Sequence, residues 1–137
     1  MKILMLCVAN LARSQMAEGL ARQLFRSDIT VESAGSSPSS VNPFAVMAME
    51  KTGIDIERHS SKSINDINLN QIDLIITLCK DEICPVTPKG AEHLHWPFDD
   101  PAGAPGSETD VLAGFERVRD EIREKLLCFG KERGYLS

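Results

Sequence analysis

The chain has 137 residues, of which 42% are hydrophobic and 26% charged, and its formal net charge at pH 7 is −5. These values are typical of a globular protein with one buried core, so we expect a single domain over residues 1–137. The negative charge argues against a surface that binds nucleic acid or an anionic membrane. We find no signal-peptide or membrane-span pattern, which favours a cytoplasmic protein with reduced cysteines.

Strand and helix patterns alternate in the first half of the chain. Short apolar runs are typical of buried parallel strands, whereas apolar residues at helical spacing indicate amphipathic helices. The predicted elements are a strand over residues 3–6, a helix from the N-cap Ser14 to Phe25, a strand over residues 30–34, and a helix from the N-cap Asn42 to Lys51.

The same alternation continues to the C-terminus. The predicted elements are a short helix over residues 66–71, strands over residues 74–78 and 91–96, a loop over residues 97–106, and a long helix that opens at Thr109 or Asp110. This pattern predicts an α/β fold, a three-layer sandwich around a central four-stranded parallel sheet. Ligands bind at the carboxyl ends of such strands, so Cys7, Cys79 and the loop after Trp96 should share one rim.

Cys7 and Arg13 are separated by five residues in a tight strand-to-helix loop. Backbone N–H groups of such a loop converge on a tetrahedral oxyanion, and the helix dipole adds positive potential. Arg13 can donate two hydrogen bonds to the anion, while the same field favours the Cys7 thiolate, which Ser14 can hydrogen-bond. The alternative is a buried strand-end cysteine and a solvated arginine. The predicted oxyanion loop comprises Cys7, Val8, Ala9, Asn10, Leu11, Ala12, Arg13 and Ser14.

Cys79 and Cys84 form a second group, with four residues between them. A structural zinc site needs four ligands, usually as two close pairs, and the chain has no second close cysteine pair, so we expect no metal. An apolar structural role is the other alternative, although charged residues surround Cys84. Cys128 is expected to pack in the C-terminal helix, and His95 and Trp96 to be structural.

Several of these motifs together resemble the low-molecular-weight tyrosine phosphatase family, and in particular its thioredoxin-coupled arsenate reductase branch. The similarity covers nearly the whole chain. It is carried by residues 7–19, by Ser33-Ala34-Gly35, Val41-Asn42-Pro43 and Thr77-Leu78-Cys79, by His95-Trp96 and residues 98–103, and by residues 115–122.

The resemblance implies reduction of arsenate to arsenite, an arsenic detoxification activity. Cys7 would form a covalent arsenate adduct, Cys79 would attack the Cys7 sulfur, and Cys84 would then attack Cys79 to leave a disulfide for thioredoxin. Asp100 matches the family's general acid. The resemblance further implies no tightly bound cofactor, competition by phosphate and sulfate, and a monomer.

Three features depart from the family pattern, and one of them is a spacer between Cys79 and Cys84 that is shorter than in some relatives. Ala9 stands where relatives have Gly, and Ala12 where many have a further Cys. Some relatives bind potassium weakly near the loop. Asn10, Glu18 and Ser33 match part of that ligand set, with Ser60 as a fourth candidate, but Lys62 stands where some relatives have an acidic ligand; we expect its ammonium group to replace the cation.

Two rival functions use the same loop. A low-molecular-weight tyrosine phosphatase would employ Cys7, Arg13 and Asp100 and hydrolyse the intermediate with water. Such phosphatases place aromatic residues after the Asp-Pro, where this chain has Ala102 and Gly103. A non-enzymatic anion-binding module would not need Cys79 and Cys84. The sequence therefore favours reduction, with residual phosphatase activity.

Overall fold

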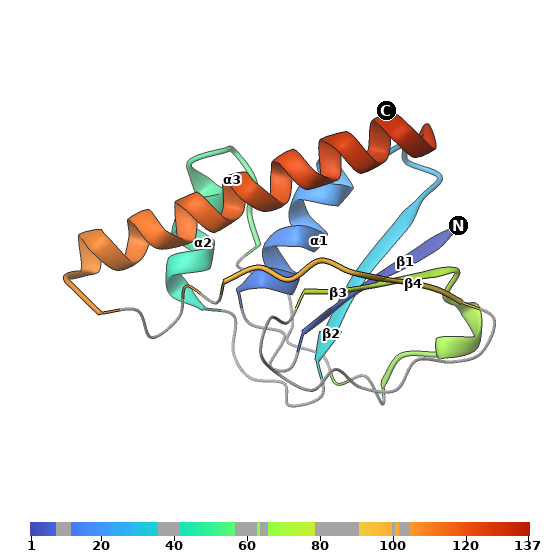
Figure 1. Cartoon of the computed structure of the whole chain (residues 1–137), viewed down its shortest axis with the longest axis horizontal. Helices are drawn as coiled ribbons and strands as arrows, with labels where there is room; N and C mark the ends of the chain where they lie inside the picture. The colour runs from blue at the N-terminus through green and yellow to red at the C-terminus, as the bar shows by residue number, and fades with distance from the viewer. Residues whose placement is uncertain are drawn as a thin grey trace.

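A four-stranded parallel sheet forms the centre of the molecule (Figure 1). The computed structural model describes residues 1–7, 12–35, 42–56, 63, 66–78, 91–99, 101 and 105–137. The strands lie in the order β2-β1-β3-β4, and every neighbouring pair is parallel. Their bounds are β1 (Lys2–Cys7), β2 (Thr30–Gly35), β3 (Leu74–Thr77) and β4 (Glu92–His95). The predicted α/β class and parallel sheet are confirmed.

The α-helices of the described residues lie on one side of this sheet, where the long α3 crosses over α1 and α2 (Figure 1). A 3-10 helix, η2, lies in the segment before β3. The bounds are α1 (Arg13–Leu24), α2 (Pro43–Glu50), η2 (Leu69–Gln71) and α3 (Glu108–Arg133). None of these helices is long and apolar enough to cross a membrane.

The sheet separates two hydrophobic clusters. Successive side chains of a strand point to opposite faces, so Ile3 and Met5 pack toward the α-helices while Leu4 and Leu6 pack on the other face. On that second face they join Ile72, next to η2. Burial of β1 on both faces explains why its sequence is a continuous apolar run rather than an alternating one.

The helix starts follow local capping chemistry. Asn42 is the N-cap of α2, as predicted, and its Oδ1 accepts a hydrogen bond from the backbone N of Phe44 at 2.8 Å. The predicted start of α3 is wrong by one or two residues, because Ser107 is its N-cap. The Ser107 hydroxyl accepts from the Asp110 amide and the Asp110 carboxylate accepts from the Ser107 amide, each at 3.2 Å. This reciprocal pair stabilises the earlier start.

A buried arginine joins α3 to α2. Arg119 is 8% exposed, and its Nη1 donates to the carbonyl oxygen of Ala48 at 2.7 Å. Ala48 lies in the last turn of α2, where carbonyl groups lack partners within the helix. The contact therefore satisfies a helix end, and the cation also complements the negative end of the α2 dipole.

Candidate active site

Cys7 is the last residue of β1, at the carboxyl end of a central strand. It pairs in register with Gly35, the last residue of β2, and it is 3% exposed. β1 has strands on both sides, so the Cys7 backbone is held by a rigid sheet. A thiol at the end of a buried parallel strand occupies the edge at which α/β proteins bind ligands.

The Arg13 side chain connects three segments at this edge. Arg13 is the first residue of α1 and is 4% exposed. Its Nη1 donates to the carbonyl oxygens of Phe98 at 3.1 Å and Leu78 at 3.4 Å. Leu78 directly follows β3, and Phe98 lies three residues after β4. The structure thus brings the ends of β1, β3 and β4 to one rim, as the sequence predicts.

Backbone hydrogen bonds hold the same three segments together. The amide of Leu78 donates to Leu6 O at 2.9 Å, and the amide of Trp96 donates to Thr77 O at 2.8 Å. The amide of Phe98 then donates to Leu78 O at 3.4 Å. The ladder therefore continues beyond the strands, and it fixes the main chain just before the positions of Cys79 and Asp100.

Ser14 is not the N-cap of α1, contrary to the sequence-based prediction. Ala12 occupies that position, with φ −93° and ψ −60° and no side-chain cap. Ser14 lies inside the first turn and is fully buried. The helix starts earlier because the buried Arg13 side chain donates hydrogen bonds to the carbonyl groups of Leu78 and Phe98 at the strand ends. Hydrogen bonding of Ser14 to a Cys7 thiolate stays a prediction.

Two members of the expected potassium set, Glu18 of α1 and Ser33 of β2, are hydrogen-bonded to each other. The Ser33 hydroxyl donates to Glu18 Oε1 at 2.8 Å, and both side chains are buried. Arg22 Nη2 lies 3.6 Å from Glu18 Oε2, and Arg22 Nε donates to Val31 O at 3.1 Å. The Glu18 carboxylate thus has a hydroxyl and a guanidinium as neighbours, which offset its burial.

Several predicted site residues lie outside the described part of the chain. They are the loop residues Val8, Ala9, Asn10 and Leu11, the relay cysteines Cys79 and Cys84, the general acid Asp100, and Ser60 and Lys62 of the potassium set. Ala12 is described, and it is 2% exposed at the start of α1. The roles assigned to these residues remain predictions.

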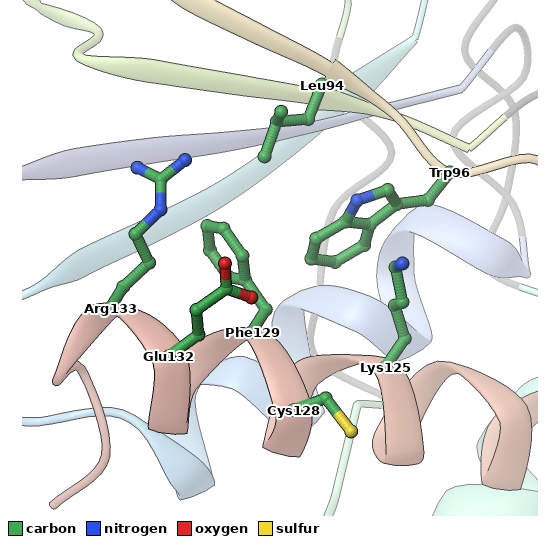
Figure 2. Close-up of a pocket in the computed structure, with 7 residues that line it drawn as sticks. All are labelled: Leu94, Trp96, Lys125, Cys128, Phe129, Glu132 and Arg133. Carbon is green, nitrogen blue, oxygen red and sulfur yellow. The ribbon is translucent and has the colours of Figure 1, made fainter.

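Cys128 is exposed, so the prediction that it packs in the core is wrong. Figure 2 shows it at a pocket of about 230 Å³ between β4 and α3. Each helical residue is rotated by about 100° from the last, so the outer side of α3 can carry Cys128 while Leu126 and Phe129 face inward. The lining of the pocket, as far as the described residues show it, does not include Cys7, Arg13 or Ser14.

An aromatic pair and an ion pair border that pocket. Trp96 and Phe129 meet edge to face, with ring centroids 5.1 Å apart. Arg133 donates to both carboxylate oxygens of Glu92, at 2.9 and 2.6 Å. These hydrogen bonds hold the pKa of Glu92 below its usual value and raise the pKa of Arg133. The edge-to-face contact and the burial of Trp96 confirm its predicted structural role.

One polar group at the end of β3 could not be predicted from the sequence. The hydroxyl of Thr77, the last residue of β3, lies 3.1 Å from His93 Nε2 and 2.8 Å from His95 Nδ1. Thr77 is fully buried, and both histidines are exposed. Two histidines at alternate positions of a strand are recognisable in the sequence. The pairing of β3 with β4, which brings Thr77 to them, is not.

Comparisons with known proteins agree on one family. The family model described as low molecular weight phosphotyrosine protein phosphatase matches residues 2–132. An arsenate reductase of Bacillus subtilis is 47% identical over 131 residues, which cover 94% of each chain. An arsenate reductase of Halalkalibacterium halodurans is 44% identical over the same length and coverage.

A solved structure shares the fold at similar coverage. A structure described as an arsenate reductase in the phosphate binding state superposes with a TM-score of 0.82 at 32% identity, and the match covers 96% of this chain and 97% of that one. The sequence relatives and this structural neighbour therefore carry the same description.

Proposed function

The chain belongs to the low molecular weight phosphotyrosine protein phosphatase family, and we propose that it reduces arsenate to arsenite with Cys7 as the nucleophile. The observation that carries this proposal is the convergence on Arg13. One buried guanidinium, six residues after Cys7, donates to the carbonyl groups of Leu78 and Phe98, which precede Cys79 and Asp100 in the sequence by one and two residues. The relatives described as arsenate reductases support the same chemistry.

The first step joins arsenate to the protein. The Cys7 thiolate attacks arsenic and forms an S–As bond, while one arsenate oxygen leaves as water after protonation by Asp100. Arg13 carries five N–H donors, so Nη1 can hold the two carbonyl oxygens while the other nitrogens act as donors to the oxyanion. The amide groups of residues 8–12 would complete the anion site.

The second step reduces arsenic. The Cys79 thiolate attacks the Cys7 sulfur, an S–S bond forms, and the S–As bond breaks with its electron pair on arsenic, which leaves as arsenite. Cys84 then attacks the Cys79 sulfur, so that the Cys7 thiolate is released and a Cys79–Cys84 disulfide remains. A thioredoxin dithiol reduces that disulfide and is itself oxidised. Thioredoxin is thus an external reductant, and the proposal needs no tightly bound cofactor.

An assay of the complete relay tests this proposal. We expect arsenate-dependent oxidation of NADPH in the presence of thioredoxin and thioredoxin reductase, with competition by phosphate and sulfate. Cys7→Ser, Cys79→Ser and Cys84→Ser should each abolish turnover. Cys128→Ser is the matched control, since Cys128 is exposed on α3 and should leave turnover unchanged. Normal turnover by both Cys79→Ser and Cys84→Ser would overturn the relay.

The phosphatase alternative shares the first nucleophile but not the relay. Hydrolysis of an aryl phosphate should be weak in the wild type and absent in Cys7→Ser, because that reaction also needs the Cys7 thiolate. Cys79→Ser and Cys84→Ser should retain it. Aryl phosphate turnover with no arsenate-dependent NADPH oxidation would favour the phosphatase over the reductase.

We also propose that the Lys62 ammonium group takes the place of a potassium ion near the loop. Glu18 and Ser33, two residues of the expected ligand set, lie together at 2.8 Å, and Glu18 is only 2% exposed. A cation close to this buried carboxylate would be favourable. Activity should therefore be insensitive to potassium. A clear rate increase on exchange of sodium for potassium at constant ionic strength would contradict this role.

A further inference from the structure

Two imidazole rings converge on one hydroxyl group at the edge of the sheet. His93 and His95 alternate along β4, and in register they lie beside Ile75 and Thr77 of β3. All four positions therefore lie on one face, the face on which Ile75 packs with Leu4 and Leu6, away from the α-helices. Among the strands that the structure describes, β4 is the outermost one on this side of the sheet.

The distances to Thr77 identify which nitrogen of each histidine ring faces its hydroxyl group. Thr77 Oγ1 lies 3.1 Å from His93 Nε2 and 2.8 Å from His95 Nδ1. A hydroxyl group has one proton, so it can donate to at most one of the two rings. Both ring nitrogens thus lie within hydrogen-bond reach of the same oxygen atom, which also lies 3.4 Å from Leu94 O, and both rings therefore lie on the same side of the strand pair.

We propose that His93 and His95 chelate a divalent transition-metal ion of the zinc, nickel or copper class, with Thr77 Oγ1 as a third polar atom beside it. Neutral imidazole is a preferred ligand of these ions, whereas magnesium and calcium favour oxygen ligands. Binding needs a lone pair on both inward-facing nitrogens, and because Zn–N bonds are about 2.0–2.1 Å long, both rings would have to turn from Thr77 toward the ion. Both histidines are exposed, so water can complete the coordination.

This site differs from the zinc site that the sequence analysis excludes. Among the residues that the structure describes, no three or more His, Cys, Asp and Glu side chains are grouped to hold a metal. The described residues of β4 therefore do not form a closed structural metal site. Two strand histidines form an open chelate instead, and its rigidity comes from the β3–β4 pairing and from the buried Thr77.

Binding of Ni²⁺ to the untagged full chain tests the proposal without reference to catalysis. Isothermal titration calorimetry of the reduced protein should give a high-affinity event that His93→Gln and His95→Gln each weaken by at least ~10-fold. The matched control is His59→Gln, which replaces the chain's remaining histidine and should bind as the wild type does. His93→Gln and His95→Gln change exposed side chains, so we expect both variants to retain the fold. Circular dichroism checks this.

Nuclear magnetic resonance locates the bound ion. Paramagnetic Ni²⁺ should broaden the ring C–H signals of His93 and His95 at a substoichiometric concentration, before the amide signals that flank the four cysteines. Equal affinities for the wild type and either strand variant would overturn the site. So would broadening that begins at the cysteines, because the thiols would then be the ligands.

Discussion

Arg13 Nη1 lies 3.1 Å from the carbonyl oxygen of Phe98, although 85 residues separate them in the chain. The same nitrogen reaches Leu78 O at 3.4 Å. A charged donor that is 4% exposed is costly to bury unless acceptors surround it. The two carbonyl oxygens supply such acceptors, so the guanidinium is oriented before any oxyanion arrives.

Arg13→Lys should reveal this orientation. Lysine keeps the charge, but it lacks the planar array of donors that can span two carbonyl oxygens and an anion. Loss of a preorganised donor lowers kcat by roughly 10²–10³-fold, and we expect a decrease of this size in arsenate turnover. Hydrogen exchange at the Phe98 amide should also be faster.

Arg26→Lys is the control for that variant, since Arg26 is exposed and pairs only with the exposed Asp28 among the contacts described for its side chain. It should change neither turnover nor exchange. An Arg13→Lys protein with wild-type turnover would show that the planar array of guanidinium donors is not needed for turnover.

Ser33→Ala should destabilise the protein. The Ser33 hydroxyl donates at 2.8 Å to a buried Glu18 oxygen, which the variant would leave without this donor. A hydrogen bond to a charged group contributes about 1.5–3 kcal/mol, so the free energy of unfolding in urea should fall by an amount of that order. Ser137→Ala, at the exposed C-terminus, should be neutral. An equal effect of the two substitutions would refute the assigned role.

Thiol alkylation should distinguish the two described cysteines. Cys128 is exposed and Cys7 is 3% exposed, so a bulky maleimide should modify Cys128 first in the native protein. Phosphate should slow modification of Cys7 and leave Cys128 unchanged, because the anion would occupy only the Cys7 loop. Mass spectrometry after short exposures gives both rates. Phosphate protection of Cys128 would place the anion elsewhere.

The ion pair of Glu92 with Arg133 should make stability depend on pH in the acid range. Hydrogen bonds from Arg133 lower the pKa of Glu92 from its ordinary 4.5. A carboxyl whose pKa is lower in the folded than in the unfolded state stabilises the fold above the unfolded value, and this contribution disappears as pH falls through the folded value.

Glu92→Gln should therefore be less stable than the wild type near pH 7, and the difference should vanish once the pH is well below 4.5. Both side chains are substantially exposed, so added salt should reduce the difference too. Urea unfolding from pH 7 to pH 3 provides the measurement, with Glu124→Gln as an exposed control on α3. A difference that grew as the pH fell would have the wrong sign.

Much of the fold was predictable because local patterns specify it. The apolar run of β1 predicts a strand buried on both faces, and Asn42-Pro43 predicts the start of α2, since these signals depend on neighbouring residues alone. The start of α1 was mispredicted at Ser14, because the position of Arg13 depends on carbonyl groups far along the chain. Cys128 was misplaced because adjacent helical residues face different environments.

The sequence alone predicts that Cys7 and Arg13 act together on an oxyanion, since their spacing and the strand-to-helix pattern around them are local features. It also determines the family, because the matched motifs extend over nearly the whole chain. Only the tertiary structure decides which distant groups meet. Parallel pairing brings Leu78 and Phe98 to Arg13, and it brings Thr77 to His93 and His95. Strand order and register set these contacts, and both depend on how distant segments pair rather than on the residues of any one segment.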